Sequence, residues 1–142
     1  MKKIIILIFL ILGFGMHIRA QVLDITITNI QNKTGNIQLG FFKNADSFNE
    51  EKPYISKTFP KNTVVNGQMN IKLNWESGVF GIALLDDEDK DGDMSYNFIG
   101  YPQEGFGFSN YYETGLKKPD FTKFCFYLNK ETKKITIKVR YM

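Results

Sequence analysis

Apolar and polar residues alternate along most of this chain, and that period of two constrains the fold more than any other feature. The stretches 23–28, 37–41, 69–75 and 134–141 each place apolar side chains at every second position. Successive side chains of a β-strand point to opposite faces of a sheet, so this alternation is typical of half-buried strands. The stretch 79–85 is apolar at nearly every position, which predicts a central strand covered on both faces.

Two pairs of these stretches are separated by turn-like sequences. Residues 23–28 and 37–41 flank Gln31-Asn32-Lys33-Thr34-Gly35, and residues 121–128 and 134–141 flank a similar polar segment. Short connections of this composition between strand-like runs favour β-hairpins. We therefore expect one hairpin near each end of the domain.

The other patterns complete an all-β domain. A weaker strand is expected at 54–59 and a short helical turn at 45–51. Together these stretches make about seven short strands with no long helix, so the predicted fold is a single antiparallel β-sandwich over residues 21–142. Trp75 continues the apolar face of 69–75 and is expected in the core.

The first 20 residues resemble a secretory signal peptide. Lys2 and Lys3 supply a charged start, residues 4–14 are almost entirely apolar, and Ala20 is a small residue of the kind found before a cleavage site. The apolar run is shorter than a membrane span requires. We expect cleavage after Ala20 and a secreted or periplasmic protein without a stable membrane span; the alternative is an uncleaved anchor.

The apparent basicity of the chain depends on this leader. The sequence has 18 Lys and Arg residues against 15 Asp and Glu residues, but Lys2, Lys3 and Arg19 precede the expected cleavage site. The mature chain then carries 15 bases and 15 acids and has no net charge. Nucleic-acid binding relies on a clear excess of cations, so the composition argues against a nucleic-acid partner.

Residues that usually carry nucleophilic catalysis are scarce. Cys125 is the single cysteine and lies in the apolar run 124–128, so no internal disulfide can form and a buried, unreactive thiol is expected. The single histidine, His17, lies in the expected leader. A mature chain without histidine has no Ser-His-Asp triad and no histidine-based zinc site. We therefore expect a non-enzymatic protein and assign no catalytic residue.

The densest chemical signal is an acidic segment directly after the expected central strand. Six of the eight residues from 86 to 93 are Asp or Glu. Asp87, Asp89 and Asp91 alternate along it, and Gly92 permits a sharp turn, which is the spacing of calcium loops of the D-x-D-x-D-G type. The spacing predicts a structural Ca²⁺ site; the alternative is a solvated acidic turn without an ion.

The ligand set of this predicted site departs from that of an EF-hand. The candidate ligands are Asp87, Asp89, Asp91, Asp93, Ser95 and Asn97. Asp93 would act through its backbone carbonyl, and Ser95 directly or through a water molecule. Phe98 stands where an EF-hand has its bidentate Glu, so an oxygen from Asn97 or from another loop would complete the shell.

A second candidate site lies in the long, loop-like segment 86–120. Aromatic residues alternate there with glycines and polar side chains, a composition that suits stacking on sugars or other planar ligands. The candidate ligand-binding residues are Tyr101, Gln103, Glu104, Phe106, Phe108 and Asn110. The alternative, which we favour, is that Phe106 and Phe108 close the edge of the sandwich. Gly105 and Gly107 would then allow close passage and adopt backbone conformations closed to other residues.

Two classes of function fit these patterns. The favoured one is a secreted, non-enzymatic module that binds an envelope component, a glycan or a protein. The alternative is a small extracellular hydrolase or carbohydrate-acting protein in which Glu104 and a carboxylate of the acidic loop form a glycosidase-like pair.

Three stretches carry a resemblance to a known family. They are the strand Gly81-Ile82-Ala83-Leu84-Leu85 with the acidic segment that follows it, the stretch 97–110, and the closing strand 135–141. In these stretches the chain resembles a family of secreted bacterial proteins called domain of unknown function 2141. The resemblance implies a transthyretin-like or immunoglobulin-like β-sandwich and an envelope or extracellular location. The family has no established activity, so the resemblance implies no catalytic residues.

Overall fold

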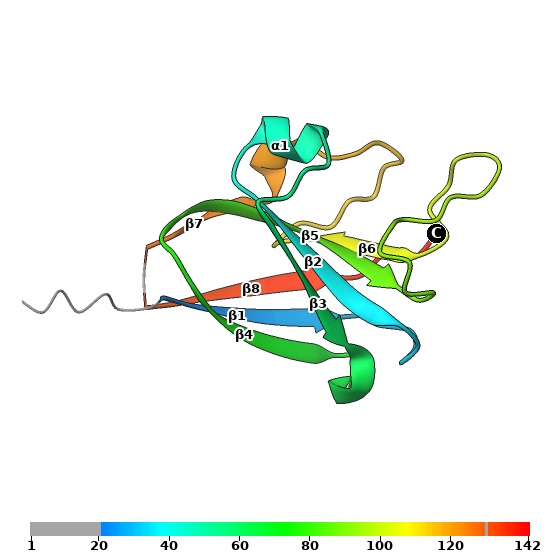
Figure 1. Ribbon diagram of the computed structural model, residues 1–142, viewed down its shortest axis with the longest axis horizontal. Helices are drawn as coiled ribbons and strands as arrows, with labels where there is room; N and C mark the ends of the chain where they lie inside the picture. The colour runs from blue at the N-terminus through cyan, green and yellow to red at the C-terminus, as the bar shows by residue number, and fades with distance from the viewer. Residues whose placement is uncertain (1–20, 130) are drawn as a thin grey trace, which may run out of the picture.

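The computed structural model describes residues 21–129 and 131–142, which fold into two β-sheets (Figure 1). The strands are β1 (Gln21–Thr28), β2 (Asn36–Phe42), β3 (Ile55–Pro60), β4 (Met69–Trp75), β5 (Gly78–Asp87), β6 (Gly105–Phe108), β7 (Cys125–Leu128) and β8 (Thr132–Lys138). The short helical segments are α1 (Ala45–Asn49), η1 (Lys61–Thr63) and η2 (Phe121–Lys123). The predicted all-β class is therefore confirmed. The signal peptide expected in residues 1–20 lies outside the described residues. Among the described residues, no helix is long and apolar enough to cross a bilayer.

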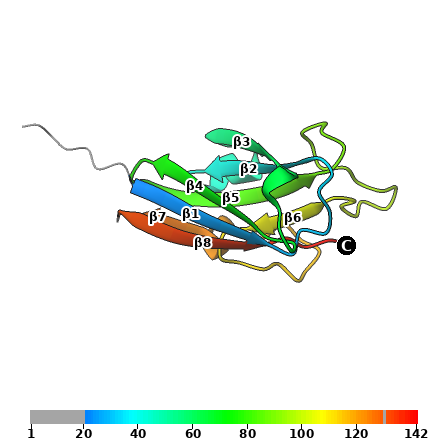
Figure 2. The ribbon, with the colours of Figure 1, turned by 90° about the horizontal axis from the view of Figure 1, so that it is seen from below.

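The two sheets form separate layers (Figure 2). The smaller sheet has the strand order β4-β1-β8, and the larger has the order β3-β2-β5-β6 with β7 also paired to β5. β5 is central, because β2 pairs with one of its edges while β7 and β6 share the other. β5 ends in the acidic segment, so the centre of the larger sheet positions the predicted metal loop.

Neither predicted hairpin forms. β1 belongs to the smaller sheet and β2 to the larger, and β8 and β7 are separated in the same way. β1 also pairs with β8 in parallel, with Ile25 opposite Ile135, so this one pair departs from the predicted antiparallel arrangement. Alternation identifies which side chains of a strand are buried, but it does not identify the neighbouring strand.

The core lies between the two sheets and is built from alternating side chains of both. Ile25, Ile82 and Ile135 are almost completely buried in it. Phe41 of β2 stacks on Trp75 of β4 with ring centroids 4.2 Å apart, which joins the two sheets. Trp75 thus packs against the core, as predicted, although it is only partly buried.

A second apolar cluster, which we call the outer aromatic cluster, covers part of the outer face of the larger sheet. Its members are Phe42, Phe48, Phe108, Phe121 and Phe124. Phe48 comes from α1, and η2 brings Phe121 onto the central strand β5. Gly81 leaves room for these rings, because a Cβ atom there would lie 2.6 Å from the ring of Phe124. β5 is therefore covered on both faces, as its nearly continuous apolar sequence predicts.

The glycines of β6 are needed for close packing. A Cβ atom on Gly105 would lie 2.5 Å from the ring of Tyr141, and one on Gly107 would lie 2.7 Å from Cγ2 of Ile137. Neither glycine has a positive φ, so the predicted backbone conformations closed to other residues are wrong. The close passage is confirmed, and Phe108 is buried at the edge of the sheet as expected.

Replacing Gly105 by alanine is expected to lower the free energy of unfolding by about 1–3 kcal/mol, because the new methyl group would overlap Val139 and Tyr141. Urea denaturation measures the change. The matched control is Gly115→Ala, where the nearest atoms belong to the flexible side chain of Glu113. Equal stability of the two variants would contradict this account of β6.

Cys125 is half-buried, so the prediction of a buried cysteine is wrong, while the low reactivity of its thiol stays a prediction. Cys125 begins β7, in which Phe126 and Leu128 point into the core. The period of two therefore turns Cys125 to the outer face, where it packs at the border of the outer aromatic cluster.

Candidate functional site

β5 delivers the acidic segment to one end of the two-sheet structure, near the C-terminus (Figure 1). Ile82 and Leu84 of β5 face the core between the sheets. Asp86 continues on the same face and is fully buried, whereas Asp87 points to the opposite face and leads into the loop. The alternation of the strand thus gives two adjacent acids different surroundings.

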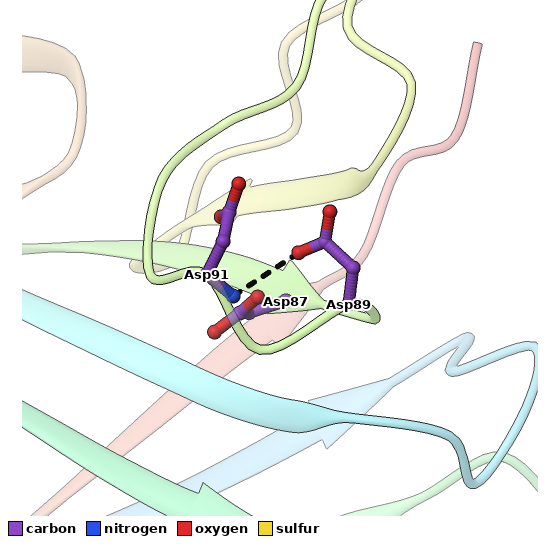
Figure 3. A group of neighbouring side chains, drawn as sticks. All are labelled: Asp87, Asp89 and Asp91. Atoms are coloured by element: carbon purple, nitrogen blue, oxygen red, sulfur yellow. Dashed lines mark hydrogen bonds between the residues drawn. The ribbon is translucent and has the colours of Figure 1, made fainter.

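Asp87, Asp89 and Asp91 converge as the spacing predicts (Figure 3). One carboxylate oxygen from each lies within 4.8 Å of the other two. Asp89 and Asp91 are exposed, but Asp87 is only 3% exposed. Like charges this close repel each other by on the order of 1 kcal/mol per pair in bulk water, and by more beside a protein. A bound cation would reverse this repulsion.

Backbone N–H groups of the loop donate hydrogen bonds to these three carboxylates. The N–H of Asp91 donates to Oδ1 of Asp89 at 3.1 Å, and the N–H of Asp93 donates to Oδ1 of Asp91 at 2.8 Å. The N–H of Gly92 donates to Oδ2 of Asp87 at 3.2 Å. Gly92 has a φ of 84°, in the left-handed region, which explains the glycine at the predicted sharp turn.

The second oxygen of Asp87 distinguishes this loop from an ordinary acidic turn. Oδ1 is buried and has no hydrogen-bond partner among the residues that the structure describes. A buried carboxylate oxygen without a partner is costly, since it has lost its water and gained nothing in return. An ion among Asp87, Asp89 and Asp91 would satisfy it. Carboxylate oxygens suit Ca²⁺, which accepts irregular geometry more readily than Mg²⁺ does.

The other predicted ligands have different surroundings. Asp93, predicted to act through its backbone carbonyl, is exposed, and its role as a ligand stays a prediction. The N–H of Ser95 donates to Oε2 of Glu104 at 3.1 Å. Oδ1 of Asn97 accepts two backbone N–H groups of the turn that follows it, at 3.1 and 2.9 Å. Of the six predicted ligands, three therefore have carboxylates that lie close together: Asp87, Asp89 and Asp91.

Glu104 fastens the two ends of the acidic loop to each other. It is buried, and its Oε1 accepts the N–H of Glu88 at 2.9 Å while its Oε2 accepts the N–H of Ser95. Both oxygens of this carboxylate are thus occupied by backbone donors. Glu104 thereby positions the loop.

A buried ionic network, absent from the sequence-based expectations, adjoins the loop on the core side. Nζ of Lys61 pairs with Oδ1 of Asp86, and the hydroxyl of Tyr141 donates to Oδ2 of the same carboxylate. Burial raises the pKa of Asp86, and the hydrogen bonds from Lys61 and Tyr141 oppose that rise. Burial and the hydrogen bond to Asp86 also raise the pKa of Tyr141.

The network extends from the buried ion pair to the acidic loop. Nζ of Lys61 donates to Oδ1 of Asn32 at 3.2 Å, and Nδ2 of Asn32 donates to Oε1 of Glu88 at 2.9 Å. The core-facing position of Asp86 signals a buried acid. Lys61 gives no such signal, because it follows Pro60 in a polar turn where a lysine is normally exposed.

The predicted ligand-binding residues after the loop separate into packed and exposed groups. Phe108 is buried in the outer aromatic cluster and Phe106 is half-buried against it. Oδ1 of Asn110 accepts a backbone N–H of β8 at 2.9 Å, so this side chain fastens the segment to the smaller sheet. Tyr101 and Gln103 are exposed. These residues therefore do not form one flat platform.

The fold and the loop define the class of this protein: an all-β domain of two sheets with a cluster of carboxylates at the end of its central strand. The model of a protein family described as "Uncharacterized protein conserved in bacteria (DUF2141)" matches residues 25–136. The chain belongs to this family, as its sequence resemblance predicts. A comparison with curated proteins and one with solved structures each found no match.

Proposed function

We propose that this protein is a secreted, non-catalytic binding module whose acidic loop holds a structural Ca²⁺ ion. One observation carries the metal site: Oδ1 of Asp87 is buried beside the carboxylates of Asp89 and Asp91, and no described residue is its partner. The leader-like N-terminus supports export, and exported calcium modules bind the ion at about 10⁻⁴–10⁻³ M. The occupied oxygens of Glu104 and the absence of histidine after His17 support a role without catalysis.

The ion would act by ordering the segment that follows the loop. Residues 94–103 lie between the carboxylates and Glu104, whose side chain accepts the N–H groups of Glu88 and Ser95. A bound Ca²⁺ would fix the start of this segment, as Glu104 fixes its end. The aromatic side chains between them would then be held rigidly enough to contribute to recognition.

Calcium is expected to stabilise residues 21–142 by mass action. At a hundredfold excess over Kd, the gain in the free energy of unfolding is about 2.7 kcal/mol. Asp89→Ala should remove most of this gain, because it removes one of the three converging carboxylates. Since Asp89 is exposed, its loss should change the site more than the fold. Thermal melting of the EDTA-treated protein during a Ca²⁺ titration measures the effect, with Asp120→Ala, an exposed acid outside the loop, as the matched control.

An unchanged melting temperature at about 5 mM Ca²⁺, which saturates typical extracellular modules, would show that the loop is only a solvated turn.

The hydrolase alternative is tested by screening the protein against glycan, ester and phosphate substrates. Turnover that Glu104→Gln abolishes, in a variant that still melts cooperatively, would contradict the non-catalytic role.

A further inference from the structure

An apolar groove runs over the outer face of the larger sheet, beside the outer aromatic cluster. Its volume is about 670 Å³. Small-molecule sites in proteins occupy about 300–1,000 Å³. β5 and β6 contribute Ala83, Leu84, Phe106 and Phe108 to its lining. The other lining residues are Phe42 of β2, Phe48 of α1, Glu51, Met142 and residues of the segments 94–102 and 113–119.

The groove is surrounded by apolar side chains that solvent reaches. Those that are exposed are Tyr96, Ile99, Tyr101, Leu116 and Met142. Leu116 is 70% exposed and Ile99 is 62% exposed. Single exposed apolar residues are common, but a set that lines one groove marks an interaction surface. The acidic loop leads directly into the segment that carries Ile99, so the metal site and the groove are consecutive along the chain.

The charges in the groove leave one cation without a partner. The charged lining residues are Glu51, Glu113, Lys117 and Lys118. Nζ of Lys118 lies 3.1 Å from Oε1 of Glu51, and Glu113 accepts the N–H of Gly115 at 2.6 Å. This hydrogen bond is the main cause of the lowered pKa of Glu113. Lys117 is exposed and makes no ion pair or hydrogen bond with any residue that the structure describes.

The edge of β6 beside the groove is already paired at Phe106, so it offers no free backbone groups there to a peptide. The N–H of Phe106 donates to the carbonyl of Arg140 at 3.0 Å, and the N–H of Arg140 donates back at 2.7 Å. An extended peptide gains much of its affinity from such backbone groups when it adds to a sheet. At β6 those at Phe106 are already paired, so the groove offers mainly apolar surface and the charge of Lys117.

We propose that this groove binds a single-chain anionic amphiphile, of which a fatty-acid carboxylate is the simplest example. The alkyl chain lies along Ala83 and Phe106, where burial of apolar surface favours binding. The anionic head pairs with Lys117, the one lining charge that lacks a partner within the described chain. The inference rests on the proposed binding role and names the class of ligand that this role would serve.

Calorimetry of residues 21–142 with sodium laurate, below the micellar concentration, tests the proposal. It is run in EDTA and again with Ca²⁺ kept below the precipitation limit of calcium laurate, because the proposed ion would order part of the groove lining. We expect one laurate per chain, bound at least about tenfold more tightly than dodecyltrimethylammonium, which has an alkyl chain of nearly the same length and the opposite charge. No binding of laurate, or equal binding of the two amphiphiles, would overturn the proposal.

Two charge reversals locate the site. Lys117→Glu should weaken laurate binding at least about tenfold, whereas Lys72→Glu, on the exposed face of β4 and outside the groove, should leave it unchanged. Equal effects of the two variants would overturn the assignment. A dimer in sedimentation that Leu116→Glu dissociates would also overturn it, since a second copy would then fill the groove.

The calcium melting experiment keeps this inference separate from the proposed metal site. Loss of laurate binding with calcium stabilisation intact would overturn the groove alone. Laurate binding without calcium stabilisation would overturn the metal site alone. Turnover of a substrate would overturn the non-catalytic role on which both depend.

Discussion

Lys61→Met is expected to lower the free energy of unfolding by about 3–5 kcal/mol, because it leaves the carboxylate of Asp86 buried without its counter-ion. Both side chains of this pair are completely buried. Methionine keeps most of the volume of the lysine chain, so the loss reports the charge and not a cavity. Urea denaturation with an unchanged m value is the measurement.

The double variant Lys61→Met, Asp86→Leu is the matched control. Replacing a whole buried ion pair by apolar residues is often neutral, so the double variant should recover most of the stability that the single variant loses. The hydroxyl of Tyr141 loses its acceptor in the double variant but still accepts the N–H of Gln31, which limits the recovery. A single variant within about 0.5 kcal/mol of the wild type would show that Asp86 is satisfied without Lys61.

Phe124→Ala is expected to lower the free energy of unfolding by about 3–5 kcal/mol, the usual cost of truncating a buried phenylalanine. Phe124 is 1% exposed. Its ring centroid lies 4.8 Å from that of Phe48, 5.1 Å from that of Phe108 and 5.4 Å from that of Phe121. The variant therefore removes the centre of the outer aromatic cluster and loosens α1 and η2 on the sheet.

The same substitution at Phe98 is the control, because that side chain is 99% exposed. Phe98→Ala should change the stability by no more than about 0.5 kcal/mol. Chemical denaturation of both variants gives the comparison. A small effect at Phe124 would mean that the outer aromatic cluster is not part of the cooperative fold.

Alternation predicts most strands of this protein because a two-layer structure buries one face of each. The runs around Ile25, Ile71 and Ile135 form strands in the smaller sheet, as their pattern indicates. Pairing is not local information. The turn before Ile37 looks like a hairpin turn, yet it carries the chain from one sheet to the other. The apolar alternation does not predict β6, because two of its four positions are glycines. Gly105 and Gly107 are small so that neighbouring side chains can pack against them.

The candidate metal site is partly local and partly not. The convergence of Asp87, Asp89 and Asp91 follows from their spacing and from the turn at Gly92. The burial of Asp87 and the unpartnered Oδ1 depend on neighbours that the spacing does not specify. The role of Glu104 also depends on distant neighbours. Its sequence context predicts a ligand-binding residue or a catalytic acid, but in the structure its carboxylate accepts two backbone N–H groups of the preceding loop.

The parallel pairing of β1 with β8 governs how this chain reaches its folded state. Ile25 pairs with Ile135, and almost the whole domain lies between these two residues in the sequence. The central strand of the smaller sheet therefore has one neighbour with a very large sequence separation, which raises the contact order of the fold. Until the C-terminal strand is available, one edge of β1 exposes unpaired backbone next to alternating isoleucines, a combination that invites aggregation. We therefore expect this sheet to form late and slowly during folding, and truncations that remove the last strand should yield insoluble protein.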